Sequence, residues 1–140
     1  MTDPADQLPV TFDVSGRPAP KGSQNTYGFG KVVESSRHLP AWTAAVTLAA
    51  KRAWKFGEID KHVPLGLFVT FRTKRPQAPK HPVHDVTVPD LDKLVRAVGD
   101  ALAGVIYHDD AQVSLLRAEK LLTDHNDIAE AGCTITVARA

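Results

Sequence analysis

The segment 90–103 constrains the fold more than any other stretch, because its apolar residues recur with the period of an α-helix. They stand three or four residues apart, at Leu91, Leu94, Val95, Val98, Ala101 and Leu102. This spacing places all of them on one face of a helix, which then faces the core. Gly104 comes directly after this segment, where a glycine commonly ends a helix. The sequence therefore predicts an amphipathic helix with a buried apolar stripe.

Other segments alternate apolar and polar residues, which is the period of a half-buried strand. We expect strands at residues 10–15, 64–72, 111–122 and 133–137, and a weak strand or hairpin arm at 26–33. A second helix is expected over about residues 40–55, opened by Pro40 and ended by Gly57. This order of elements predicts an α+β fold, a mixed β-sheet with two main helices packed on it.

The length of 140 residues fits one domain with a single core. We expect residues 1–8 to be a disordered N-terminus and residues 9–140 to form the domain. The one cysteine, Cys133, lies in an alternating stretch and is expected to be a buried apolar side chain. No signal peptide or membrane span is evident in the sequence, which favours an intracellular protein without a membrane partner.

Four carboxylates lie close together in the sequence. Asp90 and Asp92 stand at the start of the predicted helix, and Asp109 and Asp110 follow the loop that ends it. Each pair has an ordinary structural explanation, because aspartates stabilise helix N-termini and turns. Together they also suit a divalent cation such as Mg²⁺, which prefers oxygen ligands. The spacing permits the four to converge but does not require it, so both interpretations stay open at this point.

The formal net charge is only +1, so any surface for a polyanion must be local. Basic side chains gather in two turn-rich stretches, residues 16–23 and 72–85. The candidates for contacts to a nucleic-acid backbone are Arg17, Lys21, Arg72, Lys74, Arg75 and Lys80. Such contacts would make binding depend on salt.

The motifs around the acids resemble those of the RusA family of Holliday junction resolvases. The resemblance rests on Pro89-Asp90-Leu91-Asp92-Lys93-Leu94 with Arg96, on Asp100-Ala101-Leu102, on Asp109-Asp110-Ala111-Gln112-Val113, and on Lys120. Residues 16–23 resemble the family's N-terminal loop, and Trp42 resembles its aromatic residue near the start of the first helix. The likeness extends from about Val10 to Val137 and is specific between Pro89 and Lys120.

The resemblance implies a small homodimeric, Mg²⁺-dependent endodeoxyribonuclease that resolves four-way DNA junctions by paired phosphodiester hydrolysis, with Mn²⁺ as a substitute for Mg²⁺. It implies that Asp90, Asp92 and Asp110 are metal ligands, with Asp109 as an accessory ligand, and that Arg96 joins the three ligands in catalysis. It also adds Lys93, Arg96 and Lys120 to the expected DNA-binding residues. Many family members come from phages or prophages, so the expected location is the cytoplasm of a bacterial or phage-infected cell.

Two positions depart from the family's usual pattern. Lys93 stands where an asparagine usually follows the second aspartate, and Arg96 replaces the lysine expected four residues after Asp92. Arginine keeps a cation for a phosphate group, but it does not give up a proton near neutral pH. The alternative function is therefore a non-catalytic protein that binds DNA junctions through a degenerate metal site.

Overall fold

The computed structural model describes residues 3–22 and 37–140, so the hairpin arm expected at 26–33 lies outside the described residues. The main elements are, in chain order, β1 (Val10–Ser15), α2 (Leu39–Ala53), β2 (Leu65–Thr73), α3 (Leu91–Leu102), β3 (Val113–Leu122) and β4 (Gly132–Arg139). Short 3-10 helices precede three of the strands, namely η1 (Pro4–Gln7), η2 (Asp110–Gln112) and η3 (Ile128–Glu130). This order confirms the predicted α+β class.

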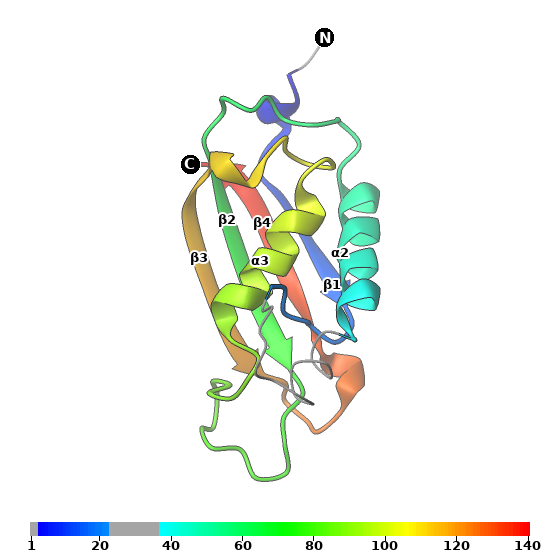
Figure 1. The fold of residues 1–140 in the computed structure, drawn as a ribbon, viewed down its shortest axis with the longest axis vertical. Helices are drawn as coiled ribbons and strands as arrows, with labels where there is room; N and C mark the ends of the chain where they lie inside the picture. The colour runs from blue at the N-terminus through cyan, green and yellow to red at the C-terminus, as the bar shows by residue number, and fades with distance from the viewer. Residues whose placement is uncertain (1–2, 23–36) are drawn as a thin grey trace.

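The four strands form one mixed sheet in the order β1-β4-β2-β3. β4 pairs antiparallel with both β1 and β2, whereas β2 and β3 are parallel. Parallel neighbours need a long crossover connection, and here that connection contains α3. Figure 1 shows α3 lying across the sheet in front of β2 and β4, with α2 beside β1.

The core lies between the sheet and the two helices. Alternate residues of β2, such as Val69 and Phe71, are buried together with Leu94 and Val98 from the apolar stripe of α3. Cys133 of β4 is buried in the same core, and burial raises the pKa of its thiol to about 12. Both the stripe and the packing role of the cysteine follow the sequence-based expectation.

On the face of the sheet that points away from the helices, β1 and β4 carry polar side chains. Thr11 and Thr136 share a hydrogen bond of 2.8 Å between their hydroxyl groups. Thr134 donates to Asp13 at 2.6 Å and accepts from a guanidinium nitrogen of Arg72 at 2.9 Å. These bonds hold the Arg72 guanidinium against the sheet.

Within the N-terminal segment that we expected to be disordered, residues 4–7 form η1. Asp3 caps this turn by accepting from the Ala5 amide at 3.0 Å, and Ala5 itself is buried. Asp6 pairs with Arg139 at 3.0 Å, which ties the turn to the end of β4.

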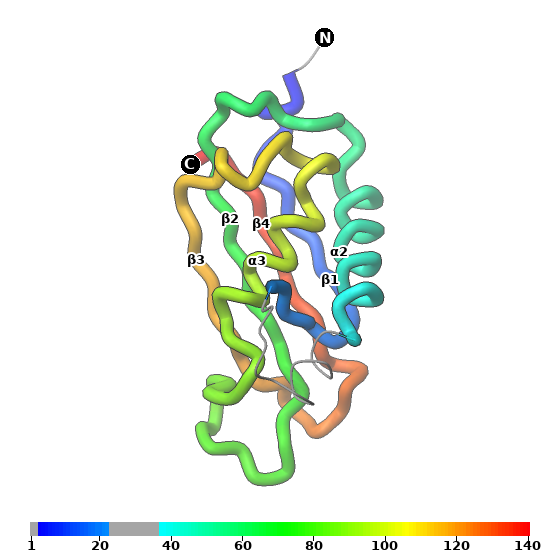
Figure 2. Tube along the Cα trace, in the orientation of Figure 1, coloured from blue at the N-terminus to red at the C-terminus, as the bar shows by residue number. Residues whose placement is uncertain are grey.

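The segment between β2 and α3 protrudes past the ends of the strands before it returns to the helix (Figure 2). Its second half is bonded to β3, because the Asp85 amide donates to the Lys120 carbonyl at 3.0 Å and the Leu122 amide donates to the Val83 carbonyl at 2.8 Å. The entry to α3 is thus tied to β3. None of the helices within the described residues has the length and apolar character needed to cross a membrane.

Candidate active site

Asp90 occupies the N-cap position of α3, but within the described structure its carboxylate caps none of the helix amides. The side chain is 59% exposed, and its Oδ2 lies 3.7 Å from Nζ of Lys93. Asp92 follows in the first turn and is also exposed. An amide cap, the ordinary explanation for an aspartate at a helix start, therefore does not account for Asp90. Its carboxylate is open to an outside ligand.

Asp109 has a structural task at η2. Its Oδ1 accepts from the Ala111 amide at 2.9 Å, and its own amide donates to the side chain of Gln112 at 3.1 Å, which completes a capping box. The accessory metal role expected for Asp109 would therefore compete with this cap.

Asp110 turns toward α3. A Cβ atom built on Gly99 would lie only 3.1 Å from Oδ1 of Asp110, so the helix backbone and the carboxyl group approach closely at this glycine. The Tyr107 hydroxyl is 3.0 Å from the Gly99 carbonyl oxygen and 3.1 Å from Oδ1 of Asp110. The buried tyrosine therefore holds the carboxyl group beside the helix.

The carboxyl groups of Asp110 and Asp100 lie close enough for each to shift the pKa of the other. Burial, and next the neighbouring Asp100 carboxyl group, raise the pKa of Asp110 to about 6. The Asp110 carboxyl group lowers the pKa of Asp100, and the hydrogen bond and charge of Lys21 lower it further. Two adjacent carboxylates repel each other once both are ionised, so a divalent cation would stabilise this pair.

The loop after β1 packs on the same flank of α3. Lys21 forms an ion pair with Asp100, and its amide donates to the Lys93 carbonyl at 3.1 Å. At the next residue, a Cβ atom on Gly22 would lie 2.6 Å from a guanidinium nitrogen of Arg96. Lys21, expected to bind DNA, thus contributes its ammonium group to the acid site.

The expected metal ligands do not form one cluster. Across residues 3–22 and 37–140, no group of three or more His, Cys, Asp or Glu side chains could hold a metal ion. Asp92 precedes Gly99 by seven residues, which corresponds to about 10 Å of helical rise. Asp90 and Asp92 therefore lie near one end of the α3 flank and Asp110 near the other, with the exposed Arg96 between them.

The Asp100–Asp110 pair nevertheless fits a divalent cation by its donor chemistry. Mg²⁺ is commonly held by one or two carboxylates, with waters and substrate phosphates filling the remaining positions. The structure brings two carboxyl groups close enough at this point that each shifts the pKa of the other. Asp100 was not among the residues we expected to bind metal.

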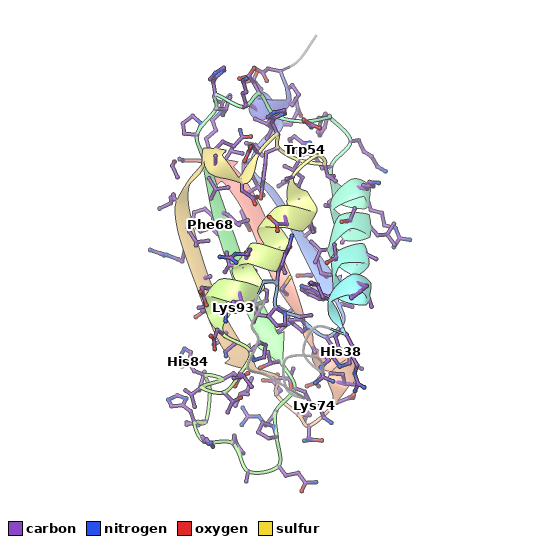
Figure 3. The ribbon with its side chains drawn as sticks, in the orientation of Figure 1. His38, Trp54, Phe68, Lys74, His84 and Lys93 are labelled. Carbon is purple, nitrogen blue, oxygen red and sulfur yellow. The ribbon has the colours of Figure 1, made fainter. Side chains whose placement is uncertain are left out.

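A cavity of about 430 Å³ adjoins the other end of α3. Arg17, Lys74 and Arg75 line it, together with Pro89, which directly precedes Asp90. The two basic stretches of the sequence therefore meet at one place, next to the start of the helix. Figure 3 shows Lys74 and His84 on the protruding segment and Lys93 on α3. This end of the molecule presents cations beside Asp90, as a DNA backbone would require.

Besides Lys21, three of the expected DNA-binding residues have their charged groups engaged within the protein. Arg75 donates to the Thr123 carbonyl at 2.8 Å and to the Pro82 carbonyl at 2.7 Å. The guanidinium of Arg72 bonds to Thr134 on the sheet, as described above. Lys120 is only 9% exposed, and its Nζ donates to main-chain carbonyls. Lys120 is therefore not available for the phosphate contact that we expected, because β3 directs its side chain toward the interior.

The expected cations that remain at the surface are Arg17, Lys74, Lys80 and Arg96, which are exposed, and Lys93, which is partly exposed beside Asp90.

Asp100 and Tyr107 are the site residues that the sequence analysis missed. One sequence signal did include Asp100, because Asp100-Ala101-Leu102 is among the segments that resemble the family. No comparable pattern marked Tyr107.

The family model described as Endodeoxyribonuclease RusA matches residues 15–130. No curated protein matches the chain. The matched region contains both groups of aspartates, the loop that carries Lys21, and the basic residues that line the cavity.

Proposed function

This chain belongs to the endodeoxyribonuclease RusA family, and we propose that it resolves Holliday junctions by Mg²⁺-dependent, paired phosphodiester hydrolysis as a homodimer. The family accounts for the coarser part of this function, because its members are DNA endonucleases that act on Holliday junctions and generally depend on a divalent metal. The identity of the metal, the paired cuts and the dimer are the parts that we add.

The contact between Asp100 and Asp110 carries the proposal of a metal centre. Asp110 belongs to the family motif, and its raised pKa results from burial and from a second carboxyl group. We propose Asp90, Asp92 and Asp110 as metal ligands, as the motif implies, and we add Asp100 as the partner of Asp110. Asp109 is retained only as an accessory ligand, since it caps η2.

Each residue of the α3 flank then has a task in hydrolysis. Bound Mg²⁺ would polarise the scissile phosphate and lower the pKa of a coordinated water. Arg96 lies between the two acidic groups, where its guanidinium can clamp a phosphate oxygen while staying protonated. Lys93, beside Asp90, can neutralise a second phosphate. Arg17 and Lys74 would hold the DNA backbone that enters past Asp90.

The homodimer is proposed because of the substrate. A four-way junction offers two equivalent strands, and a two-fold symmetric protein would present one site to each of them. Paired hydrolysis then means one nick in each of two opposed strands. Mn²⁺, which also accepts oxygen ligands, should replace Mg²⁺. We also propose the cytoplasm of a bacterial or phage-infected cell as the location, as the family resemblance implies.

Cleavage of a synthetic four-way junction tests the function. The wild-type protein should introduce symmetric nicks with Mg²⁺ or Mn²⁺ and none with EDTA, and it should migrate as a dimer in light-scattering chromatography. Asp92→Asn and Asp110→Asn should still bind the junction but should no longer cut it. Lys51→Ala, on the exposed side of α2, serves as a control that should cut like wild type.

The division of the acids between two ends of α3 favours one competing candidate, a junction-binding protein without catalysis. That candidate predicts junction binding that is indifferent to Mg²⁺, with no nicks at any metal concentration. If wild type behaves in this way, or if both aspartate variants cut normally, the proposed active site is wrong.

A further inference from the structure

We propose that Lys120 is a positioning residue that fixes the start of α3 from outside the helix and so leaves the Asp90 carboxylate free for metal. This inference rests on the proposed function, because it concerns the same site. It replaces the DNA contact that the sequence suggested for Lys120.

The ammonium group of Lys120 is enclosed by the segment that enters α3. Its Nζ donates to the Pro89 carbonyl at 2.6 Å and to the Thr87 carbonyl. Pro89 and Thr87 are the first and third residues before Asp90. A single buried cation on β3 therefore holds the backbone at the point where the chain turns into the helix.

Asp85 completes the arrangement as the counter-ion. Its Oδ2 lies 4.0 Å from Nζ of Lys120, and its side chain is only 7% exposed. The same carboxylate accepts from the Thr73 hydroxyl at 2.6 Å, from the Thr87 hydroxyl at 2.6 Å and from the Thr87 amide at 2.9 Å. We call Lys120, Asp85, Thr73 and Thr87 the entry clamp.

The entry clamp explains why Asp90 does not cap its own helix. An aspartate at the N-cap usually bonds to an amide of the first turn, which fixes both the helix start and the carboxylate. Here the Asp90 carboxylate makes no such bond within the described structure, yet the chain enters the helix with an extended Asp90 backbone. The helix start is held by Lys120 instead, so the carboxylate can point outward.

The contacts argue against a direct role of Lys120 on DNA. A phosphate contact needs a solvent-facing cation, whereas this ammonium group is buried and already has two carbonyl partners and a counter-ion. Its removal should therefore act on DNA cleavage only through the position of Asp90. This gives Lys120 a different experimental signature from Arg17 or Lys74.

Hydrogen exchange tests the clamp without reference to catalysis. In Lys120→Met, amides of residues 85–94 should exchange faster than in wild type, while amides of α2 and β4 should keep their protection. Lys120→Arg, which retains donors for the two carbonyls, should recover most of the protection. Unchanged exchange at residues 85–94 in Lys120→Met would overturn the proposal.

Metal binding tests the consequence for Asp90. Calorimetric titration of the DNA-free protein with Mn²⁺ should show an affinity roughly 10- to 100-fold weaker in Lys120→Met, the range typical for residues that orient metal ligands. Junction binding in EDTA should stay as in wild type, as should the salt dependence of that binding. Normal Mn²⁺ affinity, or a loss of junction binding with a shallower salt dependence, would contradict a positioning role and indicate a phosphate contact. Lys51→Met is the matched control.

A milder variant keeps the test decisive if Lys120→Met does not fold. Thr87→Val removes one hydroxyl donor to Asp85 at an exposed position, so it should fold and show the same changes with smaller amplitude. Its failure to alter either exchange or Mn²⁺ affinity would count against the clamp. If wild type neither binds Mn²⁺ nor cuts junctions, the proposed function fails, whereas the exchange result still decides whether Lys120 holds the helix start.

Discussion

The carboxyl group of Asp110 lies against Gly99 and is close enough to that of Asp100 for each to shift the pKa of the other, although one residue lies in α3 and the other opens η2. This contact joins two parts of the family motif that the sequence keeps ten residues apart. Lys21 forms an ion pair with Asp100, so the loop after β1 also belongs to the site. The predictions below test this site and the surfaces around it.

Metal affinity should fall steeply as the pH drops through about 6, the raised pKa of Asp110. A proton and a metal ion compete for the same carboxylate, so metal binding is favoured above this pH and lost below it. In Asp100→Asn the carboxyl partner that raises the pKa is gone, and the inflection should move to lower pH. Mn²⁺ titrations of the DNA-free protein between pH 5 and 8 measure both curves. Identical inflections in the two proteins would show that Asp100 does not act on Asp110.

Gly99→Ala should separate stability from metal binding. Alanine favours a helix interior over glycine by about 1 kcal/mol, but its Cβ would press on Oδ1 of Asp110 at 3.1 Å. We expect a melting temperature at or above that of wild type together with weaker Mn²⁺ binding. If the effect passes through Asp110, the double variant Gly99→Ala/Asp110→Asn should bind Mn²⁺ no more weakly than Asp110→Asn alone. If the losses of Mn²⁺ affinity in the two single variants add up in the double variant, the effect of Gly99→Ala does not pass through Asp110.

Arg17→Ala and Lys74→Ala should each weaken junction binding and reduce its salt dependence. Each phosphate contact contributes about 0.9 to the slope of log affinity against log salt, so each variant should lower the slope by about 1 per protomer. Both residues line the cavity beside Pro89. Binding isotherms at several salt concentrations give the slopes, with Lys51→Ala as the control. If both variants keep the wild-type slope, the residues that line this cavity do not contact the DNA backbone.

Asp85→Asn should lower the free energy of unfolding at neutral pH by about 1–3 kcal/mol, because it weakens several hydrogen bonds to a charged group. Burial opposes ionisation of Asp85, but hydrogen bonds from Thr73 and Thr87 outweigh it, and the pKa lies below the ordinary value of 3.8. The carboxylate therefore stabilises the fold above pH about 3.8, and this contribution is lost as the pH falls through the lowered pKa. Urea unfolding of both proteins at pH 7, 4 and 3 should show the difference shrinking with acidity. If the difference in the free energy of unfolding between the two proteins stays the same at all three pH values, the lowered pKa of Asp85 does not contribute to stability.

The main elements were predictable from local sequence patterns. The stripe of α3 depends only on a period of 3.6 residues, and the alternation in β1, β2 and β4 only on a period of two. The motif around Asp90, Asp92 and Asp110 likewise identified the family before any contact was known. Even the loop that carries Lys21 was recognised, although its partner was not.

The partners of the site residues could not be predicted in the same way. Val113 and Leu116 of β3 line one cavity with Arg96 and Gly99 of α3, although strict alternation would place them on opposite faces. A register irregularity at the start of the β2–β3 pairing accounts for this, since Leu65 pairs with Val113 and Gly66 already with Leu115. Lys120 then faces the interior together with Phe71, its partner on β2.

The sequence by itself thus determined the helix stripe, the strands and the family, because each depends on residues close together in the chain. Only the tertiary structure decided that Asp110 meets Asp100, that Lys21 pairs with Asp100, and that Lys120 is buried beneath the start of α3. Those contacts depend on strand register and on how loops return across the sheet, which no local period encodes.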